Sequence, residues 1–266
     1  MKKVISKDGT SIAFDQYGAG PVVILVDGAL GYRKHWMNEQ LAAHLAHHFT
    51  VINYDRRGHG DSGDTLPYAV EREIEDIDAL IDAAGGAAYL YGLSSGAILA
   101  LEAASKLPPK VKKLALYEPP FIIDDSRPPL PADYVEHLND LIAQGRRGTA
   151  VDYFMTAALL IPEEYLEPMH SDPTWPEMEA IAHTIAYDGT FVRDFLAGKP
   201  LPAKRWLSAT MPTFVIVGGN SEPFFHDGAK SLVSLLSDAQ YRVLEGQDHG
   251  VAPEALAPLL VESLRA

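Results

Sequence analysis

Short apolar runs and helical repeats alternate along most of the chain. The apolar runs typical of strands are Lys3–Ser6, Ile12–Tyr17, Val22–Val26, Thr50–Tyr54, Ala87–Tyr91, Lys113–Glu118, Thr213–Val217 and Tyr241–Leu244. Between them, apolar residues spaced three or four positions apart predict helices at Trp36–His47, Val70–Ala84, Ser95–Leu107, Gly228–Leu236 and Pro253–Leu264. The first two runs are joined through Asp8-Gly9, a hairpin signal, whereas helices separate most of the others. The pattern predicts an α/β fold with a mostly parallel sheet that helices cover on both faces.

The alternation is interrupted between Pro119 and Leu207. This segment is rich in proline and aromatic residues, its helical stretches are short, and it contains no convincing strand. Open α/β sheets bind ligands at the carboxyl ends of their strands, where an insertion of this kind can cover the site. We therefore expect a core domain from residues 1–118 and 208–266 and a helical cap from residues 119–207. The alternative is a small helical subdomain that plays no part in gating.

Composition and charge limit the classes of partner. The 266 residues are 47% hydrophobic, enough for one large α/β domain or for a domain that carries an insertion. A net charge of −14 disfavours nucleic acids and anionic membranes, and the absence of cysteine excludes disulfides and cysteine-ligated metals. The N-terminus lacks the apolar segment of a signal peptide, and the run at residues 21–26 is too short to span a bilayer. We expect a cytoplasmic protein whose partner is a small molecule; the oligomeric state stays open.

The pentapeptide Gly92-Leu93-Ser94-Ser95-Gly96 lies between a predicted strand and a predicted helix. A serine hydroxyl becomes a nucleophile only when a base removes its proton and nearby donors stabilise the resulting negative charge. A strand–turn–helix exposes the serine at the apex and directs the first helical N–H groups toward its oxygen. This context predicts Ser94 as a nucleophile, and a tight turn without chemistry is the alternative.

His249 is the predicted general base. It follows the last predicted strand, and its place agrees with the chain order serine, acid, histidine that accompanies such a turn. His44, His47 and His48 have a spacing that can ligate a metal, but they lack an acidic partner and follow the polar face of a helix. His59 lies in a glycine-rich loop, where we expect a structural role.

These segments together resemble the α/β-hydrolase fold family over nearly the full length of the chain. The matching stretches are GLSSG, VILVDGAL where the family has its oxyanion loop, YDRRGHGDSG after the following strand, and EGQDHG near the C-terminus. The resemblance implies an eight-stranded, mostly parallel sheet with an inserted helical cap, and a nucleophilic mechanism that needs no metal, flavin or nucleotide. It does not imply a substrate.

The acid of the triad departs from the commonest family pattern. Most relatives carry an aspartate after the strand that corresponds to Thr213–Val217, but position 221 is serine here and the nearest carboxylate is Glu222. Some members place the acid after the sixth strand, where this chain has Glu118 before two prolines that end the strand. We favour Glu118 as the acid, with Glu222 as the second choice.

Two backbone N–H groups are expected to form the oxyanion hole: that of Ser95, directly after the nucleophile, and that of Ala29 in the loop after Val22–Val26. The family usually has histidine where this chain has Asp27. A carboxylate that faced the oxyanion would oppose its charge, so we expect Asp27 to turn away, toward Arg33 or Arg57. The alternative is that Asp27 contacts the substrate and marks a specialised reaction.

A serine at position 94 excludes the reactions of the family that use an aspartate nucleophile. The leading hypothesis is a serine hydrolase that cleaves an ester or lactone bond of a small, largely apolar molecule through an acyl-serine intermediate. The same triad also supports hydrolysis of carbon–carbon bonds or cofactor-free lyase chemistry. A ligand-binding protein of the same fold is the third alternative.

Overall fold

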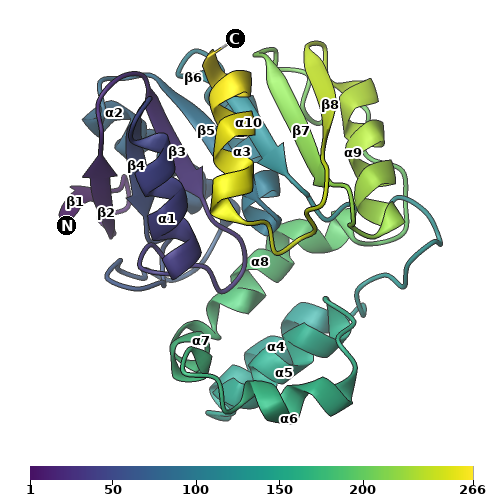
Figure 1. The fold of residues 1–266 in the computed structure, drawn as a ribbon. Helices are drawn as coiled ribbons and strands as arrows, with labels where there is room; N and C mark the ends of the chain where they lie inside the picture. Colours follow the sequence, from purple (N-terminus) through teal and green to yellow (C-terminus); the bar gives the residue numbers. More distant parts are fainter. Residues whose placement is uncertain (266) are drawn as a thin grey trace.

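The computed structural model describes residues 1–265, in which eight strands form one sheet in the order β1-β2-β4-β3-β5-β6-β7-β8 (Figure 1). The strands are β1 (Lys2–Ile5), β2 (Ser11–Tyr17), β3 (Val22–Val26), β4 (Thr50–Tyr54), β5 (Ala88–Leu93), β6 (Val111–Tyr117), β7 (Thr213–Gly218) and β8 (Ala239–Leu244). The β1–β2 and β2–β4 pairs are antiparallel, and all later neighbours are parallel. The predicted α/β class and the largely parallel sheet are confirmed.

Helices cover both faces of the sheet. One apolar core includes α2 (Val70–Ala83), α3 (Ser95–Lys106) and α9 (Pro223–Leu235); the other includes α1 (Trp36–Leu45) and α10 (Pro253–Arg265), which lie in front of the sheet in Figure 1. Helix α9 begins five residues before the predicted start, because the proline at its first position has a fixed φ and no N–H to leave unpaired. No helix within residues 1–265 is both long and apolar enough to cross a bilayer.

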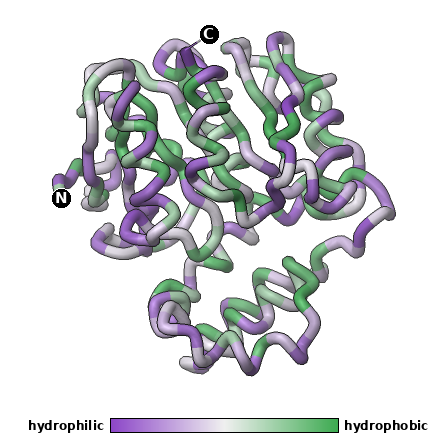
Figure 2. The backbone as a smooth tube through the Cα atoms, in the orientation of Figure 1, coloured by the Kyte–Doolittle hydropathy of each residue, from purple (hydrophilic) through white to green (hydrophobic). Residues whose placement is uncertain are grey.

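The segment between β6 and β7 forms a separate helical layer at the carboxyl ends of the strands (Figure 1). Its helices are α4 (Tyr134–Ala143), α5 (Arg147–Ala157), α6 (Leu166–Met169), α7 (Trp175–Ile181) and α8 (Thr184–Val192), with short 3₁₀ turns at Glu163–Tyr165 and Arg193–Phe195. They share an apolar cluster that also includes Leu30 from the loop after β3, and Figure 2 shows hydrophobic stretches within this layer as well as in the sheet. Helix α8 also contacts α2 and α3 of the core, so it connects the two layers.

Candidate active site

Ser94 is the single residue between β5 and α3, at the apex of a sharp turn. Its backbone has φ 56° and ψ −126°, a conformation that a residue with a side chain rarely adopts. The flanking glycines permit this turn because there is no space for a side chain. A Cβ on Gly96 would lie 2.3 Å from the carbonyl oxygens of Val26 and Asp27, and one on Gly92 would lie 2.5 Å from the carbonyl oxygen of Gly96. The turn therefore presents Ser94 at the carboxyl edge of the central strands.

Glu118, directly after β6, is the carboxylate that contacts His249. It is completely buried, and its Oε2 lies 2.7 Å from Nδ1 of His249. Its Oε1 accepts a hydrogen bond of 2.7 Å from the Gly218 N–H and another from the Ser221 hydroxyl. Because a carboxylate only accepts, this contact places the imidazole proton on Nδ1 and leaves Nε2 free to accept one. Ser221, in the loop after β7, thus helps to fix the orientation of this carboxylate.

Glu222, the second candidate for the acid, has a different partner. Its side chain is 61% exposed and pairs with Arg127, whose Nη1 lies 3.2 Å from Oε1 of Glu222. Arg127 also stacks on Phe224, 4.2 Å from the ring centroid, and donates to the carbonyl oxygen of Ala158. The structure therefore brings Glu118, rather than Glu222, into contact with the histidine.

The loop that carries His249 is held from two sides. The His249 ring stacks on Phe225 of α9, with 4.9 Å between ring centroids and 16° between planes. The Tyr117 hydroxyl at the end of β6 donates a 2.6 Å hydrogen bond to the carbonyl oxygen of Asp248. These contacts, together with that of Glu118, define the position of an imidazole whose side chain is 38% exposed.

Ser94 and His249 line the same cavity, which has a volume of about 220 Å³. Its opposite wall comes from the insertion and is mostly apolar, with Tyr134, Phe154 and Ile185 among the lining side chains. Sites for drug-sized ligands usually measure about 300–1,000 Å³, so this cavity suits a smaller molecule. Ala29 and Ser95, whose N–H groups were predicted to form the oxyanion hole, also line it.

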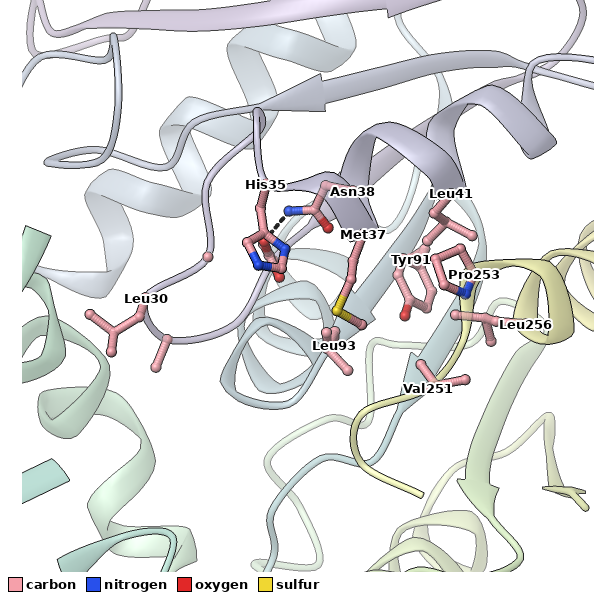
Figure 3. Close-up of a pocket in the computed structure, with 13 residues that line it drawn as sticks. Leu30, His35, Met37, Asn38, Leu41, Tyr91, Leu93, Val251, Pro253 and Leu256 are labelled. Carbon is pink, nitrogen blue, oxygen red and sulfur yellow. Dashed lines mark hydrogen bonds between the residues drawn. The ribbon is translucent and has the colours of Figure 1, made fainter. Parts of the chain in front are cut away.

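Asp27 lines a second cavity of about 210 Å³, together with Ala29, Leu30 and Gly31 of the same loop and residues of α1. Its carboxylate accepts hydrogen bonds from its neighbour's backbone, Gly28 N–H, at 2.8 Å and from the side-chain amide of Asn38. Figure 3 shows the Asn38 bond as a dashed line, with His35 beside it. Burial raises the pKa of Asp27.

The predicted partners of Asp27 are therefore wrong. Both guanidinium groups form ion pairs with other carboxylates. The partners of Arg33 are Asp15, Asp55 and Asp61. The partners of Arg57 are Asp8 and Asp76. Asp27 instead braces the loop that carries Ala29. That loop turns through a 3.1 Å hydrogen bond from Gly31 N–H to the Gly28 carbonyl oxygen.

Arg56, in the loop after β4, links three parts of the site that the sequence did not connect. Its buried guanidinium binds both carboxylate oxygens of Glu73 on α2, at 2.7 and 2.6 Å. Its Nη1 lies 2.9 Å from Oδ1 of Asp188 on α8 and 3.4 Å from the carbonyl oxygen of Asp27. Asp188 lies 132 residues away in the chain, and no local pattern marks a contact over that distance.

The remaining histidines lie elsewhere. His59 is buried and its Nδ1 lies 2.9 Å from the carbonyl oxygen of Arg57, a structural contact. His44, His47 and His48 line a shallow pocket beside α10. Within residues 1–265, no three histidine, aspartate or glutamate side chains form a group suited to a metal ion.

Comparison with known proteins matches residues 22–259 to the Alpha/beta hydrolase family. The crystal structure of an alpha/beta hydrolase from Sphaerobacter thermophilus is 51% identical, with a TM-score of 0.91 over 99% of this chain and 100% of that one. The enol-lactonase from Burkholderia xenovorans is 19% identical, with a TM-score of 0.73 over all of both chains, which shows a shared fold alone.

Among curated relatives, the uncharacterized hydrolase YraK of Bacillus subtilis is 34% identical over 115 residues, 42% of each chain. The chain spans about two fifths of the length of the curated relatives that it matches. The family match is far longer, since it runs from the first parallel strand into the last helix. On that match, the protein belongs to the alpha/beta hydrolase family.

Proposed function

We propose that the protein is a serine hydrolase that cleaves an ester or lactone bond of a small, largely apolar molecule through an acyl-serine intermediate. The observation that carries this proposal is the 2.7 Å contact between Glu118 and His249 at a cavity that Ser94 also lines. A base oriented by a buried carboxylate beside a strained serine is the arrangement that activates a hydroxyl nucleophile.

In the proposed reaction, Ser94 Oγ attacks the substrate carbonyl while Nε2 of His249 takes its proton. The N–H groups of Ser95 and Ala29 stabilise the oxyanion of the tetrahedral intermediate. The imidazolium then gives its proton to the leaving oxygen, and the carbon–oxygen bond breaks to leave an acyl-serine. Water, deprotonated by the same histidine, releases the acid and restores the serine.

The cavity supports the proposed substrate class. Its volume of about 220 Å³ and largely apolar wall favour a small molecule that binds mainly by burial of apolar surface. The net charge of −14 favours this over nucleic acid or an anionic membrane as partner. A lactone in the cavity would keep its leaving hydroxyl attached, so the product would be a hydroxy acid.

The test is a panel of p-nitrophenyl esters of increasing chain length and a few small lactones, assayed with wild type and Ser94→Ala. We expect short esters to be hydrolysed, and kcat to fall by about three orders of magnitude or more in Ser94→Ala. Mass spectrometry after an acid quench should detect an acyl group on Ser94. An inactive wild type, or a Ser94→Ala variant as active as wild type, would overturn the proposal. Tight binding of these compounds without turnover would favour a ligand-binding protein instead.

A further inference from the structure

Two buried polar atoms at the cavity have no hydrogen-bond partner. Asp188 is 3% exposed, and its Oδ1 binds Arg56 at 2.9 Å, but its Oδ2 is unpaired. The Ser95 hydroxyl is also buried and makes no hydrogen bond of ordinary geometry. Both residues line the cavity with Ser94. A buried polar atom without a hydrogen-bond partner destabilises a protein, so two such atoms at one cavity indicate a binding site for a polar group of a ligand.

The charges around Asp188 indicate which kind of ligand group could bind beside it. Arg56 binds Glu73 through two hydrogen bonds and Asp188 through one, so one buried cation serves two carboxylates. Burial raises the pKa of Asp188 above its usual value, and the opposing effects of Arg56 and of the Ser95 hydroxyl beside the carboxylate do not cancel this rise. The free oxygen of an ionised Asp188 only accepts, whereas the Ser95 hydroxyl can donate. A ligand group that both donates and accepts a hydrogen bond could bind to Oδ2 of Asp188 and Oγ of Ser95 at the same time.

We propose that Asp188 and the Ser95 side chain form a polar subsite that binds a hydroxyl group of the substrate, close to its scissile carbonyl. The substrate hydroxyl donates to Oδ2 of Asp188 and accepts from Ser95 Oγ. The subsite lies close to the scissile carbonyl because the N–H of the same residue, Ser95, is the proposed donor to the oxyanion that forms from this carbonyl. The assignment of a scissile carbonyl rests on the proposed function; the binding of a hydroxyl group does not. The preferred substrates are therefore hydroxylated esters or lactones.

Matched substrates separate this subsite from general apolar binding. We would compare kcat/KM at pH 8 for methyl esters of butanoic acid that carry a hydroxyl, methyl or oxo group at C3, and for the corresponding C2-substituted propanoates. A site built to hydrogen-bond a hydroxyl rejects analogues that lack it far more strongly than an apolar pocket does. In at least one series, wild type should prefer the hydroxyl ester about tenfold or more over both analogues.

Asp188→Asn tests the acceptor directly. The guanidinium of Arg56 only donates, so the introduced amide turns its oxygen toward Arg56 and its NH₂ group toward the cavity. The acceptor then becomes a donor, and the preference for hydroxyl over oxo should fall about tenfold or more. Asp194→Asn makes the same change at a side chain that is 87% exposed and does not line this cavity, and it should leave this ratio within about twofold. An unchanged ratio in a folded Asp188→Asn variant would sink the proposal.

Binding to Ser94→Ala protein distinguishes the subsite from the reaction. Calorimetry with the same esters should give tighter binding of the hydroxyl ester than of its methyl analogue. If wild type fails to turn over any ester but this preference in binding persists, the subsite stands and the proposed reaction does not. Equal affinities for both analogues would refute the subsite even in an active esterase. Should Asp188→Asn fail to fold, Ser95→Ala provides the second variant, and an unchanged preference for the hydroxyl ester there would count against the proposal.

Discussion

At the scale of single residues, Glu118 uses both carboxylate oxygens. One oxygen contacts His249, and the other accepts from Gly218 N–H and Ser221. The second set of hydrogen bonds prevents rotation of the carboxylate, so the imidazole is held in one orientation and one tautomer. Ser221 therefore helps to hold the carboxylate that contacts the imidazole.

We predict that Glu118→Gln lowers kcat by about three orders of magnitude or more and leaves the fold intact. The substituted amide keeps the shape of the side chain but cannot stabilise an imidazolium ion, and its NH₂ group opposes either His249 or Gly218. Steady-state kinetics with the best ester substrate and circular dichroism would measure both effects. Glu222→Gln serves as the matched control and should reduce kcat far less. The reverse ranking of the two variants would assign the acid to Glu222.

At the scale of elements, Arg56 connects the insertion to the core. Its guanidinium contacts α2 through Glu73, α8 through Asp188 and the loop after β3 through the Asp27 carbonyl oxygen. Because α8 supplies part of the cavity wall, this ion cluster sets how that wall faces Ser94. A buried cluster of this kind positions elements more than it stabilises them.

Arg56→Met should lower the free energy of unfolding by about 3–5 kcal/mol, because it leaves the carboxylates of Glu73 and Asp188 buried without a cation. Arg72→Met is the matched control on α2. The side chains of its ion pair with Glu75 are 42% and 22% exposed, far more than those around Arg56, so we expect a change of at most about 1 kcal/mol. Urea-induced unfolding of the two variants measures the difference. Equal effects would show that the buried cluster contributes nothing beyond a surface ion pair.

At the scale of the whole molecule, the buried His59 makes stability depend on pH. Burial lowers the pKa of His59 from 6.5 to about 4, and the ring donates from Nδ1 to the Arg57 carbonyl oxygen while its Nε2 is unpaired. Between these two values the unfolded chain binds a proton that the folded protein does not. Stability from this group is therefore complete above pH 6.5 and is lost as pH falls toward 4.

His59→Asn should reduce this loss, since an amide can donate to the same carbonyl oxygen without titrating. The free energy of unfolding of wild type should fall more steeply than that of the variant, by up to about 1.4 kcal/mol per pH unit between pH 6 and 4.5. Urea unfolding at several pH values gives both slopes. Parallel slopes would mean that His59 is protonated in the folded protein at these pH values.

The sequence by itself determined the features that depend on neighbouring residues. Apolar runs and helical repeats are local, and they predicted the strands, most helix bounds and the helical character of the insertion. The turn at Ser94 is equally local, because a strand, two close-packed glycines and a helix leave one place for the serine. The position of His249 after the last strand, together with the family resemblance, singled it out as the candidate base.

Only the tertiary structure decided which distant groups meet. Glu118 and Glu222 follow neighbouring strands, and the sequence could rank them but not show that one contacts His249, 131 residues from Glu118, while the other pairs with Arg127. The partner of Asp27 was predicted wrongly because the packing of the surrounding elements decides which polar groups lie next to a buried carboxylate. Asp188 left no local signal at all. Each of these contacts depends on how the layers pack, and such packing is set by the whole chain rather than by any short stretch of it.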